Sequence, residues 1–163
     1  MNASLATAFD TTAMLWRPLR TEDVPTVAAL ERESHIAPWT PRNFTDALAA
    51  GYSMTVGETA DVIVAYGVLS LAPGEAQLLN LTVAPGARRQ GLGRTLLRRF
   101  LVDARQRGAA QCFLEVRVSN AAAIALYAAE AFVPVARRIA YYPPGGGGER
   151  EDALVMRRAL AAS

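Results

Sequence analysis

The feature that most constrains the fold is a strand, a basic loop and a helix that follow one another within residues 79–104. Leu79, Leu81 and Val83 alternate with polar residues, the period-2 pattern of a strand, and we expect this strand to be buried. The strand should end at Pro85-Gly86, because proline cannot donate a ladder hydrogen bond and favours a turn. After the loop, apolar residues at helical spacing predict an amphipathic helix that ends before Gly108. These residues are Leu92, Leu96, Leu97, Phe100, Leu101 and Ala104.

The loop between this strand and this helix has the composition of a phosphate-binding turn. Gly91 and Gly93 allow the backbone to approach a ligand without a Cβ atom in the way. The first amides of the helix lack intrahelical partners and lie at the positive end of its dipole. The predicted anion site is Arg88, Arg89, Gln90, Gly91, Leu92, Gly93 and Arg94. A Walker loop is excluded because the chain has no lysine, and a dinucleotide fingerprint is excluded because Leu96 replaces its third glycine. A glycine-rich turn without a ligand is the structural alternative.

The composition of the 163 residues predicts one globular domain, spanning residues 16–163, after an extension over residues 1–15 that we expect to be flexible. No stretch is apolar enough for a membrane span, so no membrane partner is expected. The single cysteine, Cys112, excludes an internal disulfide, fits a reducing cytoplasmic compartment and is expected to be buried in a strand. One histidine and one cysteine cannot build a common zinc site, so we expect no metal.

Charge is distributed unevenly along the chain. Residues 1–75 contain nine carboxylates and four arginines, whereas residues 76–163 contain thirteen arginines and six carboxylates. The basic half suits a phosphorylated small ligand, and the acidic half favours a cationic partner. Direct nucleic-acid binding is not expected, because no basic motif is interleaved with aromatic residues. Either charge cluster is also explained by a solvated face.

The rest of the chain alternates strand and helix patterns, which predicts a mixed α/β fold built on one sheet. Strands are predicted at residues 17–20, 53–58, 62–71, 75–83, 111–118, 132–139 and 153–160, with helices at 21–34, 40–50, 92–107 and 121–130. Residues 141–148, with their prolines and glycines, are predicted to form a loop.

Two motifs carry a resemblance to a known family. Arg89-Gln-Gly-Leu-Gly-Arg94 resembles the pyrophosphate loop of the GCN5-related N-acetyltransferases (GNAT), which bind acetyl-coenzyme A there. Residues 113–127, together with residues 138–143 and 150–153, are more specific. They resemble the RimI branch of that family, which acetylates the N-terminal alanine of the eighteenth small-subunit ribosomal protein. The resemblance spans residues 17–160 and implies the GNAT fold, with a mostly antiparallel sheet splayed between strands 4 and 5 and about four helices.

The resemblance also implies roles for individual residues. Glu115 matches the general base and Tyr127 the general acid that protonates the departing thiolate, while Asn120 matches a coenzyme-binding position. The other implied contacts are the backbone of Leu81, Thr82 and Val83 with the acetyl and pantetheine groups, and Trp39, Tyr141 and Tyr142 with the peptide. Each residue also has a structural alternative: an ion pair with Arg117 for Glu115, ring packing for Tyr127, helix capping for Asn120 and a packed strand end for the tyrosine pair. His35 is expected near the same entrance but not as the base.

Acceptor chemistry favours an N-terminal amine. Freeing an α-amine of its proton at neutral pH costs about 1 kcal/mol, whereas freeing a lysine costs roughly 4–5 kcal/mol. The expected partner is thus the N-terminus of a ribosomal protein, and the enzyme is expected to be a monomer. Other N-termini, lysines, a small amine, or a coenzyme-binding module without turnover remain alternatives. Two departures from the family pattern affect turns: Ala131 replaces the usual glycine, and Ala140 replaces an asparagine.

Overall fold

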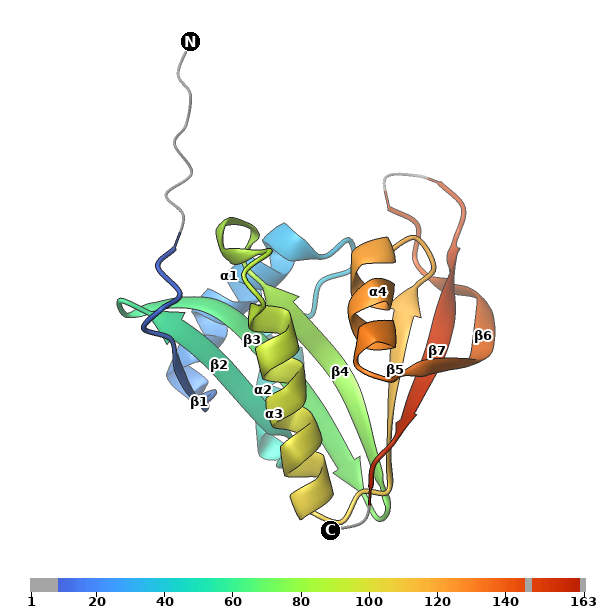
Figure 1. The fold of residues 1–163 in the computed structure, drawn as a ribbon. Coiled ribbons are helices and arrows are strands. Elements are labelled where there is room, and N and C mark those ends of the chain that lie inside the picture. The colour runs from blue at the N-terminus through green and yellow to red at the C-terminus, as the bar shows by residue number, and fades with distance from the viewer. Residues whose placement is uncertain (1–8, 146–147, 162–163) are drawn as a thin grey trace.

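A twisted sheet with helices on both faces forms the framework of the protein, shown as a computed structural model in Figure 1. The structure describes residues 9–145 and 148–161. The strands are β1 (Leu15–Pro18), β2 (Ser53–Thr59), β3 (Val62–Ala72), β4 (Glu75–Val83), β5 (Gln111–Arg117), β6 (Val133–Tyr142) and β7 (Glu151–Ala159). The helices are α1 (Val24–Ser34), α2 (Pro41–Ala49), α3 (Leu92–Gln106) and α4 (Ala121–Ala129), with short 3₁₀ turns at Thr21–Asp23 and Pro85–Ala87.

The sheet is splayed at its centre. Its order is β1-β2-β3-β4-β5-β7-β6, and each neighbouring pair is antiparallel except β4 and β5. These two parallel strands pair only up to Leu78 and Leu114, and beyond that point they diverge (Figure 1). A bulge lies at the same place, because Val68 pairs with Asn80 and the next residue of β3 pairs with Leu78. Bulges bend a strand, so β4 turns away where its pairing to β5 stops. The expected fold, with its splay between strands 4 and 5, is confirmed.

The two faces of the sheet are covered by different helices. Helices α1 and α2 pack over β2 and β3 through a core that includes Val27, Phe44, Val56, Tyr66 and Val68. On the opposite face, α3 and α4 pack over β4, β5 and β7 through a core that includes Leu96, Phe100, Leu114, Tyr127 and Met156. A Cβ atom on Gly67 of β3 would lie 2.5 Å from the ring of Phe100. Glycine at that position therefore lets α3 approach the sheet closely.

Several boundaries differ from the sequence prediction. Tyr141 and Tyr142 belong to the end of β6 and not to the following loop, because Tyr142 pairs with Glu151, the first residue of β7. Within the predicted N-terminal extension, residues 9–14 lie against the domain. Met14 packs on a small core cluster, and the Thr59 hydroxyl donates a 2.5 Å hydrogen bond to the carbonyl oxygen of Asp10. Residues 1–8 lie outside the described part of the chain.

The burial of β4 also differs from the apolar alternation. Asn80 and Thr82 are only 8% and 3% exposed, whereas Leu79 and Leu81 are half-buried. The strand is buried, as predicted, but in this segment its polar side chains are more buried than its leucines. The polar side chains point into hydrogen-bonded surroundings that the alternation could not show.

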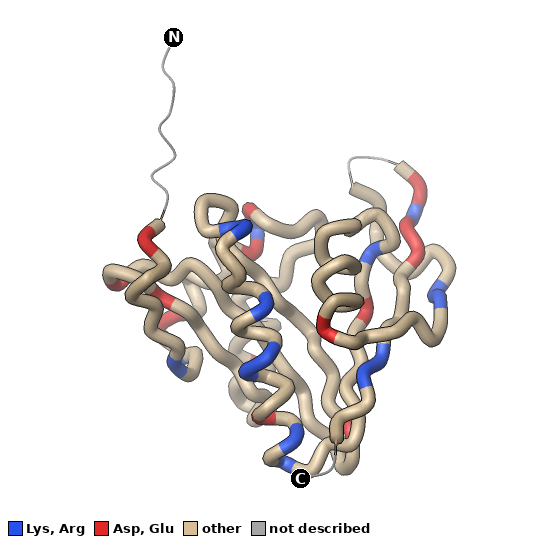
Figure 2. Tube along the Cα trace, viewed as in Figure 1, with Lys and Arg blue, Asp and Glu red and all other residues tan. Residues whose placement is uncertain are grey.

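Several arginines of the basic half of the chain lie on a single helix, α3. Figure 2 shows a row of arginines along α3, the helix that follows the glycine loop. Its outward positions carry Arg94, Arg98, Arg99 and Arg105. Within the described residues, no helix is both long and apolar enough to cross a bilayer.

Ala131 and Ala140 occupy left-handed backbone conformations, with φ of 65° and 49°. Both are positions where the sequence departs from the family pattern at a turn, and Ala131 follows the last residues of α4. A side chain with a Cβ atom is strained in this region, by roughly 1–2 kcal/mol.

Replacing Ala131 with glycine should stabilise the protein by about 0.5–1 kcal/mol, because the strain relieved exceeds the entropy gained by the unfolded chain. The matched control is Ala128→Gly, at an exposed position inside α4, which should destabilise by about 1 kcal/mol. Urea unfolding of both variants measures the difference. Equal destabilisation by both would show that Ala131 is unstrained.

Candidate active site

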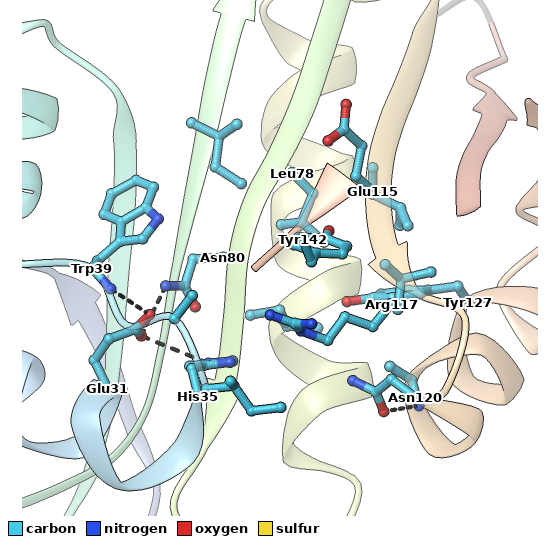
Figure 3. Close-up of a pocket in the computed structure, with 17 residues that line it drawn as sticks. Glu31, His35, Trp39, Leu78, Asn80, Glu115, Arg117, Asn120, Tyr127 and Tyr142 are labelled. Carbon is cyan, nitrogen blue, oxygen red and sulfur yellow. Dashed lines mark hydrogen bonds and ion pairs between the residues drawn. The ribbon is translucent and has the colours of Figure 1, made fainter. Parts of the chain in front are cut away.

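A cavity of about 220 Å³ lies between the diverging strands β4 and β5 (Figure 3). Its walls come from the end of α1 and the connection to α2, from β4 and β5, from α4, and from the end of β6. Of the predicted site residues, it is lined by Trp39, Leu81, Glu115, Asn120, Tyr127 and Tyr142. Thr82, Val83, Tyr141 and the predicted anion loop at residues 88–94 do not line it. Segments that are distant in sequence therefore bring the expected base, the expected acid and residues expected to contact the acceptor peptide to the walls of one cavity.

Glu115 projects from β5 with its side chain 15% exposed. Its carboxylate lies 3.2 Å from Nε of Arg138 on β6. The expected alternative partner, Arg117, is engaged elsewhere: it pairs with Glu151 at 3.3 Å and donates to the carbonyl oxygen of Pro143. The carboxylate is thus held by a cation that approaches across the sheet, and it remains on the cavity wall.

Tyr127 lies on α4, 8% exposed, with its ring edge-on to Phe132. Burial raises the pKa of its phenol, so the group stays protonated across the neutral range. In the described part of the chain its hydroxyl has no hydrogen-bond partner, although it borders the cavity. Asn120 caps the same helix by accepting a 3.2 Å bond from the backbone N–H of Ala123. The helix is therefore fixed at its start, while the hydroxyl is left available to a ligand.

The two adjacent tyrosines of β6 have different positions. Tyr142 borders the cavity, and the Arg117 guanidinium stacks 4.5 Å from its ring centre. Burial, followed by the charge of Glu115, raises the pKa of Tyr142 to about 12. Tyr141 is 41% exposed and stacks with Arg138, and interaction with the Glu115 carboxylate raises its pKa. Only Tyr142 therefore reaches the predicted peptide site directly.

A buried carboxylate that the sequence analysis did not assign, Glu31 of α1, forms the opposite wall. It is 2% exposed and accepts hydrogen bonds from the Tyr66 hydroxyl, from Nδ2 of Asn80 at 2.9 Å and from the backbone N–H of Trp39 at 3.2 Å. These bonds tie α1, β3, β4 and the α1–α2 connection together. The sequence did carry one signal, since Glu31 occupies a position on the apolar face of its helix.

His35 extends this network. Its Nε2 lies 2.7 Å from the Thr82 hydroxyl and 3.7 Å from the Glu31 carboxylate. The Thr82 hydroxyl in turn donates to the side-chain oxygen of Asn80 at 2.7 Å. Figure 3 shows the imidazole on the cavity wall facing β5. The α1–α2 connection is thereby fastened to β4.

The glycine loop has the geometry of an anion site. Gly91 is the residue before α3, with φ of 78° and no side-chain cap on the helix, so the first amides of α3 are free of a capping side chain. A Cβ atom on Gly93 would lie 3.5 Å from Leu126, an ordinary contact. Packing within the protein thus does not require glycine at position 93, whereas close approach of a phosphorylated ligand would.

The predicted arginines of this loop have different surroundings. Arg88 donates to the carbonyl oxygen of Val83 at 3.1 Å, and Arg89 has a left-handed φ of 64°. Arg94 is bound 3.1 Å from Glu130 at the end of α4, whose carboxylate also accepts three bonds from Arg98. These Arg98 bonds lower the pKa of Glu130. Arg94 therefore bridges α3 to α4, and Arg88 and Arg89 are the loop cations not held by a carboxylate in the described residues.

Two other kinds of site, a metal centre and a reactive cysteine, were considered for the described parts of the chain. Over residues 9–145 and 148–161, no three histidine, cysteine or acidic side chains gather as metal ligands. Cys112 is fully buried, as expected, and burial raises the pKa of its thiol to about 11.

Comparison with known proteins places this geometry in a family. Residues 17–132 match the acetyltransferase (GNAT) family. The chain belongs to the GNAT family. This confirms the expected class of enzyme, an acyltransferase.

Individual relatives and solved structures show which members of the family the chain resembles. The chain is 38% identical over 138 residues to ribosomal protein bS18-alanine N-acetyltransferase of Escherichia coli, covering 85% of this chain and 92% of that protein. It is 34% identical to a putative enzyme of the same name from Bacillus subtilis, covering 86% and 91%. The E. coli crystal structure aligns with a TM-score of 0.85 at 34% identity over 93% of this chain and 96% of that one. Ard1 from Thermoplasma volcanium gives the same TM-score at 27% identity, over 92% and 99%.

Replacing Gly93 with alanine should leave stability unchanged or slightly higher, because the new methyl meets only ordinary contacts inside a helix. It should nevertheless raise the KM for acetyl-coenzyme A at least tenfold. Thermal unfolding and initial rates of thiol release test the two parts separately. An unchanged KM would remove the ligand explanation for this glycine.

Arg89→Ala should weaken acetyl-coenzyme A binding several-fold, and more strongly at low salt, because it removes an exposed cation beside the helix N-terminus. Arg105→Ala, on the last turn of α3, is the matched control because it also removes one exposed arginine. Isothermal titration of both variants gives the comparison. Equal losses would mean that only the overall charge of α3 matters.

Proposed function

We propose that this enzyme transfers the acetyl group of acetyl-coenzyme A to the N-terminal α-amine of a protein, in a complex that holds both substrates together. The observation that carries the proposal is the cavity at the strand splay, with Glu115, Tyr127 and Tyr142 on its walls. The glycine loop that we assign to the pyrophosphate follows β4, one of the two strands that border the cavity. We further propose that the acceptor is the N-terminal alanine of ribosomal protein bS18, the substrate named for its relatives. Action on a ribosomal protein would place the enzyme in the cytoplasm.

Acetyl-coenzyme A fits the residues present. Its pyrophosphate would meet the free amides of α3 together with Arg88 and Arg89, with Gly93 giving room for approach. Alternate residues of β4 direct their backbone N–H and C=O groups toward the side where β5 has separated. Those groups of Leu81 to Val83 would orient the pantetheine arm and thioester. When bound, acetyl-coenzyme A supplies an activated acetyl group whose sulfur leaves as a thiolate.

Two residues on the cavity walls are assigned to proton movement. Glu115 takes a proton from the attacking amine, directly or through one water, and its ion pair with Arg138 holds the carboxylate in place. Tyr127 donates from its hydroxyl to the departing sulfur, which is consistent with a phenol that has no other partner in the described residues. An α-amine requires less assistance than a lysine, since its ordinary pKa is about 2.5 units lower.

The acceptor class is tested with peptides. We expect the enzyme to add one acetyl group to a peptide beginning Ala-Arg-Tyr-Phe, and to add none when its α-amine is blocked. A blocked peptide carrying lysine and a panel of small amines test the alternative acceptors. Mass spectrometry of the products with assay of released thiol decides among these classes. Coenzyme binding without transfer to any of them would favour a regulatory module.

Tyr127→Phe should lower kcat by about 10²–10⁴-fold, with the KM for acetyl-coenzyme A unchanged. The unfolding free energy should change by less than about 0.5 kcal/mol, because no hydrogen bond of the described chain is lost. Since the pKa of Tyr127 is raised, the wild-type rate should show no loss from phenol ionisation below pH 10. A fully active Tyr127→Phe enzyme would refute the assigned acid.

A further inference from the structure

The hydrogen-bond chain through Glu31 fixes which nitrogen of His35 carries a proton. A carboxylate only accepts, so the Asn80 amide must direct its NH₂ group to Glu31 and its oxygen to Thr82. The Thr82 hydroxyl uses its one hydrogen in that bond. Nε2 of His35 is therefore the donor in its 2.7 Å contact with Thr82. In neutral His35, Nδ1 is then an unprotonated acceptor.

The tautomer of His35 affects the chemistry of the cavity because this side chain lines it. The side chain lines the cavity and is 39% exposed. The two ring nitrogens point in widely different directions, so Nδ1 faces away from the Thr82 and Glu31 oxygens that Nε2 contacts. Glu115 lies on the β5 wall across the same cavity. The cavity thus has two proton acceptors on opposite sides.

The proposed reaction needs two protons removed from one nitrogen. An N-terminal ammonium carries three hydrogens and the amide product carries one, while the C–N bond forms and the C–S bond breaks. One proton ends on the sulfur, as the thiol, and the other reaches solvent. Imidazole takes and releases protons readily near neutral pH, and partial exposure gives His35 a route to water.

We propose that His35 is a further catalytic residue: its Nδ1 removes the first proton from the acceptor's ammonium group and passes it to solvent. Glu115 then removes the second proton as the C–N bond forms. Tyr127 gives its proton to the departing sulfur, and the proton held by Glu115 replaces it, directly or through solvent, so that both residues return to their starting states. Glu31, Asn80 and Thr82 act as positioning residues, because they hold the imidazole with Nε2–H donated inward. The proposal rests on the α-amine acceptor of the proposed function.

The test is the pH dependence of kcat/KM for the peptide at saturating acetyl-coenzyme A, from pH 6.5 to 9.5. His35→Gln keeps a side-chain N–H that can donate to Thr82 but has no proton acceptor for an ammonium group. At pH 7 only about a tenth of an ordinary α-amine is neutral. The variant should therefore be about tenfold slower than wild type at pH 7 and approach wild type by pH 9, where the substrate is already deprotonated.

Other groups near His35 must be separated from its effect. The titratable and charged side chains around it are Glu31 on α1, Tyr66 on β3, Glu115 and Arg117 on β5, Tyr127 on α4 and Tyr142 on β6. The three tyrosines have raised pKa values and stay neutral over the tested range. Glu115→Gln should be slow at every pH, because the second proton must leave whether or not the substrate begins as an ammonium.

Controls complete the experiment. Glu33→Gln, at an exposed position on α1, should match wild type at each pH. Thr82→Val removes the hydroxyl that accepts from His35 and should show a smaller deficit with the same pH trend. A His35→Gln deficit that is absent, or constant with pH, would overturn the proposal. If wild-type enzyme acetylates no α-amine at all, the proposed function itself fails, and that outcome is distinct.

Discussion

The separation of β4 from β5 is the constraint on which the rest of the site depends. Pairing between these strands stops at Leu78 and Leu114, so the following backbone groups have no strand partner on that side. Buried peptide groups left without partners cost about 1–3 kcal/mol each. Water or a ligand must therefore satisfy them. The fold builds a cavity with a polar rim at its centre, and the chemistry is arranged around it.

The separation is maintained by interactions on both sides. On the β4 side, Glu31 binds Asn80 and His35 binds Thr82, which fastens the free half of the strand to α1 and its connection. On the β5 side, Arg117 binds Glu151 and Pro143, and Arg138 crosses to Glu115. The paired charges at the cavity suit a cationic amine, whereas the open start of α3 suits a phosphate. Under the proposed function, the cavity would receive the amine and the start of α3 would receive the phosphate groups.

Local sequence signals predicted the parts of the site that local structure determines. The glycine loop and α3 were predicted correctly because their turn, spacing and helix start lie within twenty residues. The network around Glu31 was not assigned, because Tyr66 and Asn80 are 35 and 49 residues away and meet it only through packing. For Glu115, the sequence offered pairing with an arginine such as Arg117 as an alternative but could not show that Arg138 is the arginine that pairs with it. Arg138 lies on β6, which is two strands from β5 because β7 lies between them, and this sheet order brings its side chain to Glu115.

The role of Tyr141 shows a further limit of sequence patterns. The rings of Tyr141 and Tyr142 contact each other, with their centres 5.1 Å apart, yet only Tyr142 lines the cavity. A motif that names both tyrosines cannot say which one reaches the cavity, because the left-handed backbone at Ala140 and the shifted strand register interrupt the regular alternation. The sequence thus predicts the family and the glycine loop and proposes an acid and a base, whereas the contacts of these side chains depend on the assembled sheet.

The most direct test of the account is a crystal structure with a bisubstrate analogue, in which coenzyme A is joined to the α-nitrogen of an Ala-Arg-Tyr-Phe peptide. The account predicts the pyrophosphate at the start of α3 and the α-nitrogen between β4 and β5. That nitrogen should lie within hydrogen-bonding reach of His35 or Glu115, directly or through one water, with the sulfur beside the Tyr127 hydroxyl. An analogue bound elsewhere, or a peptide nitrogen far from these side chains, would contradict it.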